Sequence, residues 1–419
     1  MHIARAALIA LLAFSLPACA NVRASLIPEA RPGLSAQPAM ARTAPQVPFP
    51  EWVAGFRLRA EAAGIRASVI DAALEGVTPD PKIIELDRNQ SEFSKAIWEY
   101  LDSAVSQARV ANGRAAMERH GAALRAAEAR YGVPAEVVAA VWGLESAYGA
   151  AKGNSDIIRS LATLAHDGRR GAFFEEELIA ALRIAQAEGI DPRAMRGSWA
   201  GAMGHTQFMP TSYLKFAVDG NGDGRRDIWG DDPTDALHST ARYLRDNGWT
   251  PGQPWGVEVR LPEGFDYRFA YRELTRLPST WARIGVTGMD GRPVPDHGLA
   301  SVLLPAGSRG PAFLVFGNFE VLETYNTADA YVIGVGHLSD RLADGGPFEA
   351  SWPREDRALT GRERRELQRL LAARGIDPGG VDGKIGPLTI EAVRRFQSSM
   401  GLVPDGYANP ALLARLRGS

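Results

Sequence analysis

Cysteine is almost absent from this sequence: Cys19 is the only one among 419 residues, so an intramolecular disulfide is excluded. The chain also lacks an excess of charge of either sign. Its 47 lysine and arginine residues nearly balance its 49 aspartate and glutamate residues, and the formal net charge is −2. The basic residues form no block, so we expect no nucleic acid among the partners of this protein.

A short apolar run begins the chain. Arg5 is followed by apolar residues from Ala6 to Leu16 and then by Pro17-Ala18-Cys19-Ala20. The run is too short to span a membrane as a mature helix and is typical of an export signal, so residues 1–20 are predicted to be a signal peptide and the protein to be periplasmic. Two processing routes stay open. Leu16-Pro17-Ala18-Cys19 resembles a bacterial lipobox, which would anchor a lipidated Cys19 in the outer membrane, whereas cleavage after Ala18-Cys19-Ala20 would release a soluble protein.

Length and composition predict a globular protein of two or three domains, since 45% of the residues are hydrophobic. Residues 21–48 read as a flexible linker, 49–345 as the main domain, 346–358 as a second linker and 359–419 as a small C-terminal domain. The main domain is helical in pattern to about residue 246, and short alternating runs between 254 and 316 predict a small extended or β lobe. The predicted fold class is therefore mainly α (α+β), with a compact three-helix module at the C-terminus.

One carboxylate stands out in the helix predicted between Pro134 and Gly149. Glu145 lies on the same helical row as Val138 and Trp142, so its carboxyl group should be desolvated. Desolvation disfavours the charged form and raises the pKa towards that of a general acid at neutral pH. Gly149 is a suitable left-handed end for the helix. The alternative is a rim glutamate that pairs with an arginine.

Further polar and aromatic groups suit a cleft for sugars. Arg169 and Arg170 follow a glycine turn, and Gln207 offers both a donor and an acceptor. Trp199 and Phe208 would supply flat apolar faces for pyranose rings, and the small residues between them would let a ligand approach closely.

Three segments of the chain form a longer pattern. They are Gly143-Leu144-Glu145-Ser146-Ala147-Tyr148-Gly149, then Ala200-Gly201-Ala202-Met203-Gly204 with Gln207-Phe208-Met209-Pro210, and finally Asn318-Phe319 through Tyr325-Asn326. The same segments occur in this order in the membrane-bound lytic murein transglycosylase B family, which this chain resembles from about residue 49 to 342. The resemblance implies a lysozyme-like catalytic core in which Glu145 is the sole catalytic carboxylate.

The same resemblance implies a set of residues that line the glycan groove. Phe173 stands where a relative can have tyrosine, and His205 stands where glycine or an aromatic residue is frequent, so the details of single subsites are open. The implied substrate-binding residues are Tyr100, Ser146, Arg169, Arg170, Phe173, Ser198, Gln207, Phe208, Tyr243, Tyr325, Asn326 and Tyr331.

The C-terminal module has a pattern of its own, which consists of Leu367-Gln368, Gly380-Val381-Asp382-Gly383, Gly386-Pro387, Thr389 and Ala392-Val393 to Phe396-Gln397. With these residues it resembles the peptidoglycan-binding domain found on many cell-wall enzymes. Val381-Asp382-Gly383 is partly repeated by Val403-Pro404-Asp405-Gly406, which predicts two turns of one type at the entries of two helices. The module carries no plausible catalytic cluster, so we expect it to bind or dock.

A calcium-binding loop is predicted from Asp219 to Asp227. Oxygen side chains occupy positions one, three and five and glycine position six, as in an EF-hand loop. Gly230 replaces the closing glutamate at position twelve, and Asp235 is the displaced equivalent of the family's closing aspartate. The predicted ligands of a structural Ca²⁺ are Asp219, Asn221, Asp223, Arg225 and Asp235; the alternative is a glycine-rich turn that holds only water or sodium.

Two functional hypotheses follow. The first is a monomeric enzyme that cleaves the β-1,4 bond between N-acetylmuramic acid and N-acetylglucosamine without water, leaving 1,6-anhydromuramyl ends. The alternative enzyme is a hydrolytic muramidase, in which Asp167, Glu320 or Glu323 would be a second catalytic acid, because glycoside hydrolases use two carboxylates. The second hypothesis is a non-catalytic scaffold that binds peptidoglycan glycan strands. No catalytic cofactor is expected.

Overall fold

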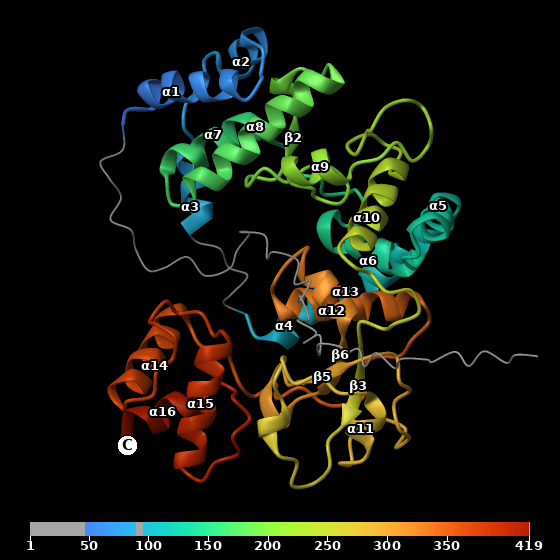
Figure 1. Ribbon diagram of the computed structural model, residues 1–419, viewed down its shortest axis with the longest axis vertical. Coiled ribbons are helices and arrows are strands. Elements are labelled where there is room, and N and C mark those ends of the chain that lie inside the picture. Colours follow the sequence, from blue (N-terminus) through green and yellow to red (C-terminus); the bar gives the residue numbers. More distant parts are fainter. Residues whose placement is uncertain (1–46, 89–94, 419) are drawn as a thin grey trace, which may run out of the picture. The chain divides into compact units, whose positions relative to one another are not determined.

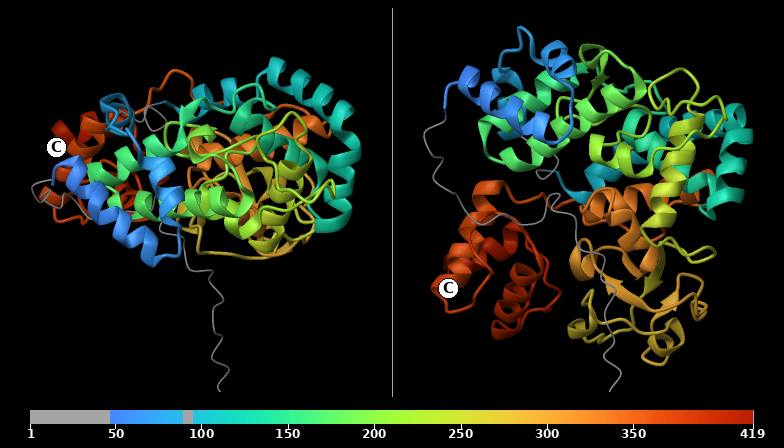
Figure 2. Two further views of the ribbon diagram at one scale, coloured as in Figure 1. Left: turned by 90° about the horizontal axis from the view of Figure 1, so that it is seen from above. Right: turned by 45° about the horizontal axis from the view of Figure 1, so that its top comes forward.

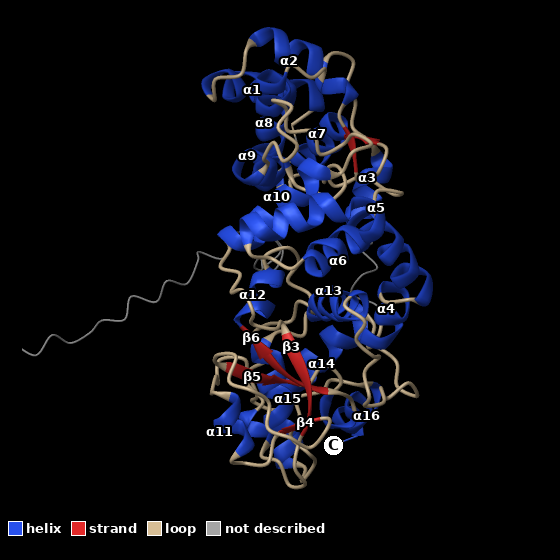
Figure 3. Cartoon of the chain, turned by 90° about the vertical axis from the view of Figure 1, so that its right-hand side faces the viewer, coloured by secondary structure: helices blue, strands red, loops and turns tan. Residues whose placement is uncertain are grey.

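The computed structural model describes residues 47–88 and 95–418. The predicted signal peptide, Cys19 and nearly all of the first linker lie outside the described residues. Within the described part, no helix is long and apolar enough to cross a membrane. Helices dominate, and most of the strands gather in one lobe (Figure 3).

In the described residues 47–88 and 95–246, ten α-helices form the first part of the main domain. Their arrangement can be followed in Figure 1. Polar caps begin several of them: Ser106 accepts from the backbone of Arg109 at the start of α5, and Asp156 caps α7 in the same way. Left-handed glycines end α5, α7 and α8. The helices are α1 (Phe49–Ala62), α2 (Ala67–Leu74), α3 (Pro81–Arg88), α4 (Ile97–Ala104), α5 (Gln107–Tyr131), α6 (Ala135–Ser146), α7 (Ile157–Asp167), α8 (Gly171–Glu188), α9 (Pro210–Phe216) and α10 (Thr234–Asp246).

Helix α6 is the central helix of this domain. It is buried from Val137 to Gly143 and packs against α5, α10 and the later helix α13 (Asp329–Leu342). The long helix α5, teal in Figure 2, runs along the edge of the helical part beside α10. A two-stranded antiparallel ladder joins β1 (Ser155–Asp156) to β2 (Arg196–Gly197) and so ties the start of α7 to the segment that precedes α9. Two distant parts of the sequence are thereby brought to the end of α6.

The predicted extended lobe is a four-stranded antiparallel sheet in the order β4-β3-β6-β5. Val257 of β3 pairs with Leu314 of β6, and Leu314 in turn pairs with Val302 of β5. The sheet has its own core around Trp281, which is fully buried. The elements of the lobe are β3 (Gly256–Arg260), β4 (Thr287–Gly288), β5 (Ala300–Leu303), β6 (Ala312–Phe316), α11 (Pro278–Ala282) and the 3-10 turns Tyr267–Phe269 and Gly307–Arg309. Helix α12 (Gly317–Glu323) connects the lobe to α13. Outside the lobe, a further 3-10 turn, Pro192–Ala194, precedes β2.

The C-terminal module consists of α14 (Gly361–Ala373), α15 (Pro387–Ser399) and α16 (Pro410–Gly418) around a separate apolar core. Thr360 and Glu363 form a capping box at the start of α14, and prolines begin α15 and α16. The mainly α fold with a small β lobe and a three-helix C-terminal module is confirmed.

Candidate active site

Glu145 lies on the last turn of α6, and its side chain is partly buried. The hydroxyl group of Tyr331, on α13, donates a hydrogen bond to Oε1 of Glu145 over 2.5 Å. Burial, followed by the charge of Glu145, raises the pKa of Tyr331 well above its ordinary value, so this hydroxyl keeps its proton and remains a donor. The same two causes raise the pKa of Tyr325. The carboxylate is thus held by a fixed phenol.

Helix α6 ends earlier than its glycine predicts. The left-handed conformation begins at Ala147 (φ 50°) and continues through Tyr148 (φ 60°) to Gly149 (φ 88°), so the last helical residue is Ser146. Left-handed conformations are costly for side chains with a Cβ and persist only where the surroundings enforce them. The sharp end therefore has a tertiary cause.

That cause is the packing of Tyr148. A Cβ on Gly113 would lie 2.3 Å from the Tyr148 hydroxyl, and one on Gly143 would lie 2.5 Å from its ring. The hydroxyl donates to the carbonyl oxygen of Arg109 over 3.1 Å, while the Arg109 guanidinium donates to the carbonyl oxygen of Gly143. Burial raises the pKa of Tyr148 to about 12. The ring thus locks the turn that follows Glu145 against α5 and α6.

His205 holds the same turn from the other side. Its Nδ1 accepts from the indole of Trp142 over 3.2 Å, and its Nε2 therefore carries the proton and donates to the carbonyl oxygen of Gly230 over 2.7 Å. Ser146 donates to the backbone oxygen of His205 and accepts from Gly149 N. Ser146 is only 1% exposed, so its hydroxyl is used inside the protein, beneath the cleft.

Gln207 and Ser198 line a hollow of about 590 Å³ together with Trp199. Gln207 has a left-handed backbone (φ 51°), and its amide nitrogen donates to the carbonyl oxygens of Lys152 (3.0 Å) and Gly204 (2.9 Å). Ser198 accepts from Ala202 N over 3.0 Å. The structure therefore brings the two predicted polar residues together at one wall.

An aromatic cluster lies behind the carboxylate. Tyr243 packs on Phe208 and on Tyr325, with ring centroids 5.7 and 4.8 Å apart. Phe208 and Tyr243 are buried, and Tyr243 donates to the carbonyl oxygen of Thr324, whereas Tyr325 is only partly buried. The partly exposed Asn326 accepts from Ala328 N over 3.0 Å. Phe208 and Tyr243 thus support the wall that Tyr325 and Asn326 present.

Tyr100, on α4, lies close to the same helix as Tyr331. A Cβ on Gly334 would come within 3.1 Å of the Tyr100 ring, and Tyr100 contributes to the raised pKa of Tyr331 after burial and Glu145. The partly buried Tyr100 therefore joins the residues around Glu145.

The arginine pair is engaged with Asp87. Arg169 donates to Asp87 Oδ2 over 2.6 Å and Arg170 to Oδ1 over 2.8 Å, and the side chain of Asp87 is 2% exposed. Burial alone would raise the pKa of Asp87, but the two arginines outweigh it and hold the pKa below its usual range. Arg170 also lies over the ring of Phe174 at 4.7 Å and farther from that of Phe173, at 5.9 Å. The side chain of Arg169 nevertheless remains 48% exposed.

The three other acids that could make a second catalytic group are engaged or exposed elsewhere. Asp167 pairs with Arg88 over 2.8 Å, and Glu323 pairs with Arg272 over 2.9 Å. Burial raises the pKa of Glu323, although the charge of Arg272 opposes it. Glu320 is exposed on α12.

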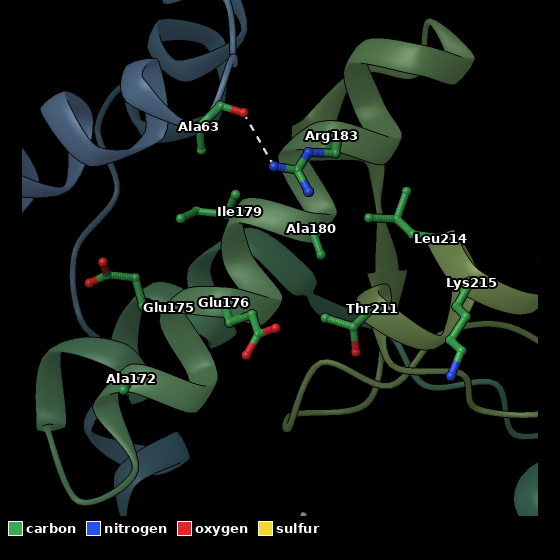
Figure 4. Close-up of a pocket in the computed structure, with 10 residues that line it drawn as sticks. All are labelled: Ala63, Ala172, Glu175, Glu176, Ile179, Ala180, Arg183, Thr211, Leu214 and Lys215. Carbon is green, nitrogen blue, oxygen red and sulfur yellow. Dashed lines mark hydrogen bonds between the residues drawn. The ribbon is translucent and has the colours of Figure 1, made fainter. Parts of the chain in front are cut away.

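A second and slightly larger hollow, about 640 Å³, lies between α8 and α9 (Figure 4). Arg183 reaches across it to the carbonyl oxygen of Ala63 over 3.2 Å. None of its lining residues belongs to the predicted groove, whereas Ser198 and Gln207 line the other hollow; Glu145 lines neither of the two. Size alone therefore does not identify the site in this protein.

The Asp219 loop gathers three carboxylates. One oxygen each of Asp219, Asp223 and Asp235 lies within 4.8 Å of the others. Asp235 is 2% exposed on the first turn of α10 and accepts from the backbone of Gly220 and Asp227. Burial, assisted by the charge of Asp219, raises the pKa of Asp235. Asn221 donates to Asp223 over 3.3 Å. Asp235 thus lies where the loop closes.

Two positioning residues were not predicted from the sequence. Arg109 holds the turn after Glu145 through the carbonyl oxygen of Gly143, and Lys152 donates to the carbonyl oxygens of Trp229 and Gly230. Each acts on backbone atoms of residues far along the chain, so no local spacing marks them.

Two protein-family models and several known proteins are similar to this chain. The family model described as Transglycosylase SLT domain matches residues 48–340, and the Putative peptidoglycan binding domain model matches residues 360–416. The membrane-bound lytic murein transglycosylase B of Escherichia coli (strain K12) is 34% identical over 251 residues, which cover 58% of this chain and 66% of that protein.

Two solved structures are similar over longer stretches. SltB3 from Pseudomonas aeruginosa in complex with NAG-anhNAM-pentapeptide is 50% identical, with a TM-score of 0.85, and the match covers 88% of this chain and 99% of the other. The Escherichia coli lytic transglycosylase SLT35 in complex with calcium is 30% identical, with a TM-score of 0.61, over 70% of this chain and 92% of the other.

Proposed function

Since the chain belongs to the Transglycosylase SLT domain family, as its sequence predicts, we propose that it is a lytic transglycosylase of peptidoglycan. It cleaves the β-1,4 bond between N-acetylmuramic acid and N-acetylglucosamine and leaves a 1,6-anhydromuramyl end. The observation that carries the proposal is the contact of Tyr331 with Glu145 at the end of a buried helix.

Glu145 carries both proton transfers. It first protonates the glycosidic oxygen as the bond from C1 of the muramyl residue breaks. The carboxylate then takes the proton of the C6 hydroxyl as that oxygen bonds to C1, which closes the anhydro ring and restores the acid. The substrate supplies the nucleophile, so one carboxylate suffices where a glycoside hydrolase needs two.

The groove residues fall into two groups by their exposure. Tyr100, Arg169, Phe173, Ser198, Gln207, Tyr325 and Asn326 are partly or well exposed, and we assign them to glycan contacts. The others are buried or engaged within the protein and position these walls: Ser146, Arg170, Phe208, Tyr243 and Tyr331.

We also propose a structural calcium ion at the Asp219 loop. The carboxylates of Asp219, Asp223 and Asp235 supply hard oxygen ligands, to which Asn221 and the backbone of Arg225 would be added. Like charges this close repel, and a divalent cation would relieve the repulsion. The calcium complex of the Escherichia coli relative supports this assignment. The proton transfers at Glu145 do not involve the ion.

The remaining assignments concern location. We propose that residues 1–20 direct export to the periplasm, that Cys19 is lipidated and that the monomer acts on glycan strands from the outer membrane. The linkers 21–48 and 346–358 then separate the anchor, the catalytic domain of 49–345 and the binding domain of 359–419. Replacing Cys19 by Ser should move the protein from the membrane fraction to the soluble periplasmic fraction.

Product analysis tests the proposed reaction. Digestion of purified sacculi should give anhydromuramyl products in mass spectra, and Glu145→Gln should abolish their release while the fold and glycan binding persist, because an amide has no acidic proton to transfer. Products with reducing muramic acid ends would indicate a hydrolytic muramidase instead. Binding without any products from the wild type would indicate a scaffold.

A further inference from the structure

The C-terminal module contains the same turn twice. Asp382-Gly383 precedes α15 and Asp405-Gly406 precedes α16, and in both turns a proline that begins the helix stands five positions after the aspartate. Gly383 and Gly406 have the same left-handed backbone, with φ of 80° and 79°. The two turns are therefore internal copies of each other.

A glutamine of the preceding helix holds each copy in the same way. Gln368 donates to Asp382 Oδ1 over 3.0 Å and accepts from Gly383 N over 2.7 Å. Gln397 donates to Asp405 Oδ1 over 2.7 Å and accepts from Gly406 N over 2.8 Å. The inner oxygen of each aspartate is thus used to build the turn.

The outer oxygen differs between the copies. Asp405 Oδ2 accepts from both the backbone N–H and the side-chain hydroxyl of Ser308 in the β lobe, each over 2.9 Å. Gly307 allows this close approach, since a Cβ there would lie 2.6 Å from the same oxygen. The Asp405 turn therefore binds a neighbouring pair of N–H and O–H donors, and Ser308 of the same chain supplies both donors.

The first copy is open. Asp382 is exposed, and within residues 47–88 and 95–418 its Oδ2 has no hydrogen-bond partner. Burial would raise the pKa of Asp382, but the bonds from Gln368 and Lys384 outweigh it and keep the pKa low, so the group is an anion. Two apolar side chains flank the turn at the surface, Val381 (42% exposed) and Leu388 (64% exposed).

The donors of Ser308 that bind Asp405 indicate which ligand would fit the Asp382 turn. Its N–H and its hydroxyl are carried by adjacent carbon atoms, and N-acetylglucosamine carries its acetamido N–H and its 3-hydroxyl on adjacent carbons as well. N-acetylmuramic acid lacks that hydroxyl because a lactyl ether replaces it. We propose that the Asp382 turn binds N-acetylglucosamine residues of the glycan strand, with Asp382 Oδ2 accepting from both groups and Val381 and Leu388 against the sugar face.

This proposal rests on peptidoglycan as the substrate, and binding to sacculi tests it. The full chain is used with Glu145→Gln so that the sacculi stay intact. Asp382→Asn should weaken binding about tenfold, since an amide nitrogen cannot accept the two donors and a charge-assisted bond is lost. Asp377→Asn is the matched control, an exposed aspartate in the same module whose carboxylate accepts from Gly379 N. Equal binding by the two variants overturns the proposal.

Selective nitrogen labelling of lysine locates the ligand. Lys384 N donates to Asp382 over 2.8 Å and so reports on the turn, while Lys152 reports on the catalytic cleft. A soluble tetramer of N-acetylglucosamine should shift the Lys384 amide signal, and cellotetraose, which has no amide, should not. Val381→Ser with Leu388→Ser leaves the bonds of the turn intact and should weaken the response. If the tetramer leaves the Lys384 amide signal unchanged, the Asp382 turn is not the binding site. If the wild type releases no anhydromuramyl products, the enzymatic function is refuted and the binding proposal is not affected.

Discussion

A phenol that donates to a catalytic carboxylate restricts where that carboxylate can point. Tyr331 approaches Glu145 from α13, while burial keeps its own proton in place. We expect Tyr331→Phe to lower kcat by about 10- to 100-fold, the value of one charge-assisted hydrogen bond, with little change in KM. Tyr213→Phe is the control, because Tyr213 is also buried but donates its hydrogen bond to the carbonyl oxygen of Arg226. Equal kcat values for the two variants would show that the hydrogen bond from Tyr331 to Glu145 does not contribute to catalysis.

His337 makes stability depend on pH. Burial, followed by the charge of Arg341, lowers the pKa of His337 to about 4, and its ring stacks on Phe348. Between about pH 6.5 and pH 4 the unfolded chain binds a proton that the folded protein does not, so the free energy of unfolding falls as the pH falls. The loss is about 3 kcal/mol by order of magnitude. His337→Phe should flatten this part of the curve in urea unfolding at several pH values, and unchanged slopes would contradict the assignment.

At the scale of elements, periodicity and turn residues were enough to predict the helical domain, the small β lobe and the position of Glu145 on a helix. The end of that helix was not predictable, because Tyr148 imposes it through its packing on Gly113, which lies far earlier in the sequence, on α5. The burial of Ser146 and Tyr243 was equally hidden, since each is decided by packing between helices that are distant in sequence.

The Asp219 loop is the element whose stability should depend on an added ion. A ligand that binds only the folded state contributes RT ln(1 + [L]/Kd), or about 2.7 kcal/mol at a hundredfold excess over Kd. Calcium should therefore raise the melting temperature of the wild type, and Asp219→Ala with Asp223→Ala should abolish the rise while initial rates at low temperature stay similar. Asp231→Ala, an exposed neighbour, is the control. If millimolar calcium does not change the melting temperature of the wild type, the loop is a glycine-rich turn and not a calcium site.

On the scale of the whole molecule, the C-terminal module has its own core but is not loosely attached. Arg394 donates to the carbonyl oxygen of Ala270 and lies over the Tyr271 ring at 4.5 Å, in addition to the bonds between Asp405 and Ser308. The linker also contributes, because Trp352 packs against the core of the catalytic domain. The sequence predicted the module and its linker but not this docking, since the contacts join surfaces that no local pattern marks.

We expect a chain that ends at Ala358 to stay folded, because the two large cores of the main domain contain no residue of the module. Only the small cluster of Ala96, Trp98 and Ala306 packs against the module, through Tyr407. It should melt at a somewhat lower temperature, remain active on short soluble glycans and bind intact sacculi less tightly. Melting curves, turnover and co-sedimentation check the three expectations. Ser308→Ala in the full chain removes one of the docking bonds, the one from the serine hydroxyl, and is the control for weakened docking. Unchanged sacculus binding by the shortened chain would show that the module is no anchor.

The packing of Tyr148 also limits how this site can change over time. Its ring fills space that Gly113 and Gly143 leave by having no side chain, so these three positions cannot vary independently. A methyl group at Gly143 is intolerable while the ring is present, and a smaller residue at 148 leaves a void that such a methyl group would partly fill. A larger residue at position 143 and a smaller residue at position 148, each harmful alone, would then be tolerated together. Whichever of the two substitutions occurs first gives a less stable protein.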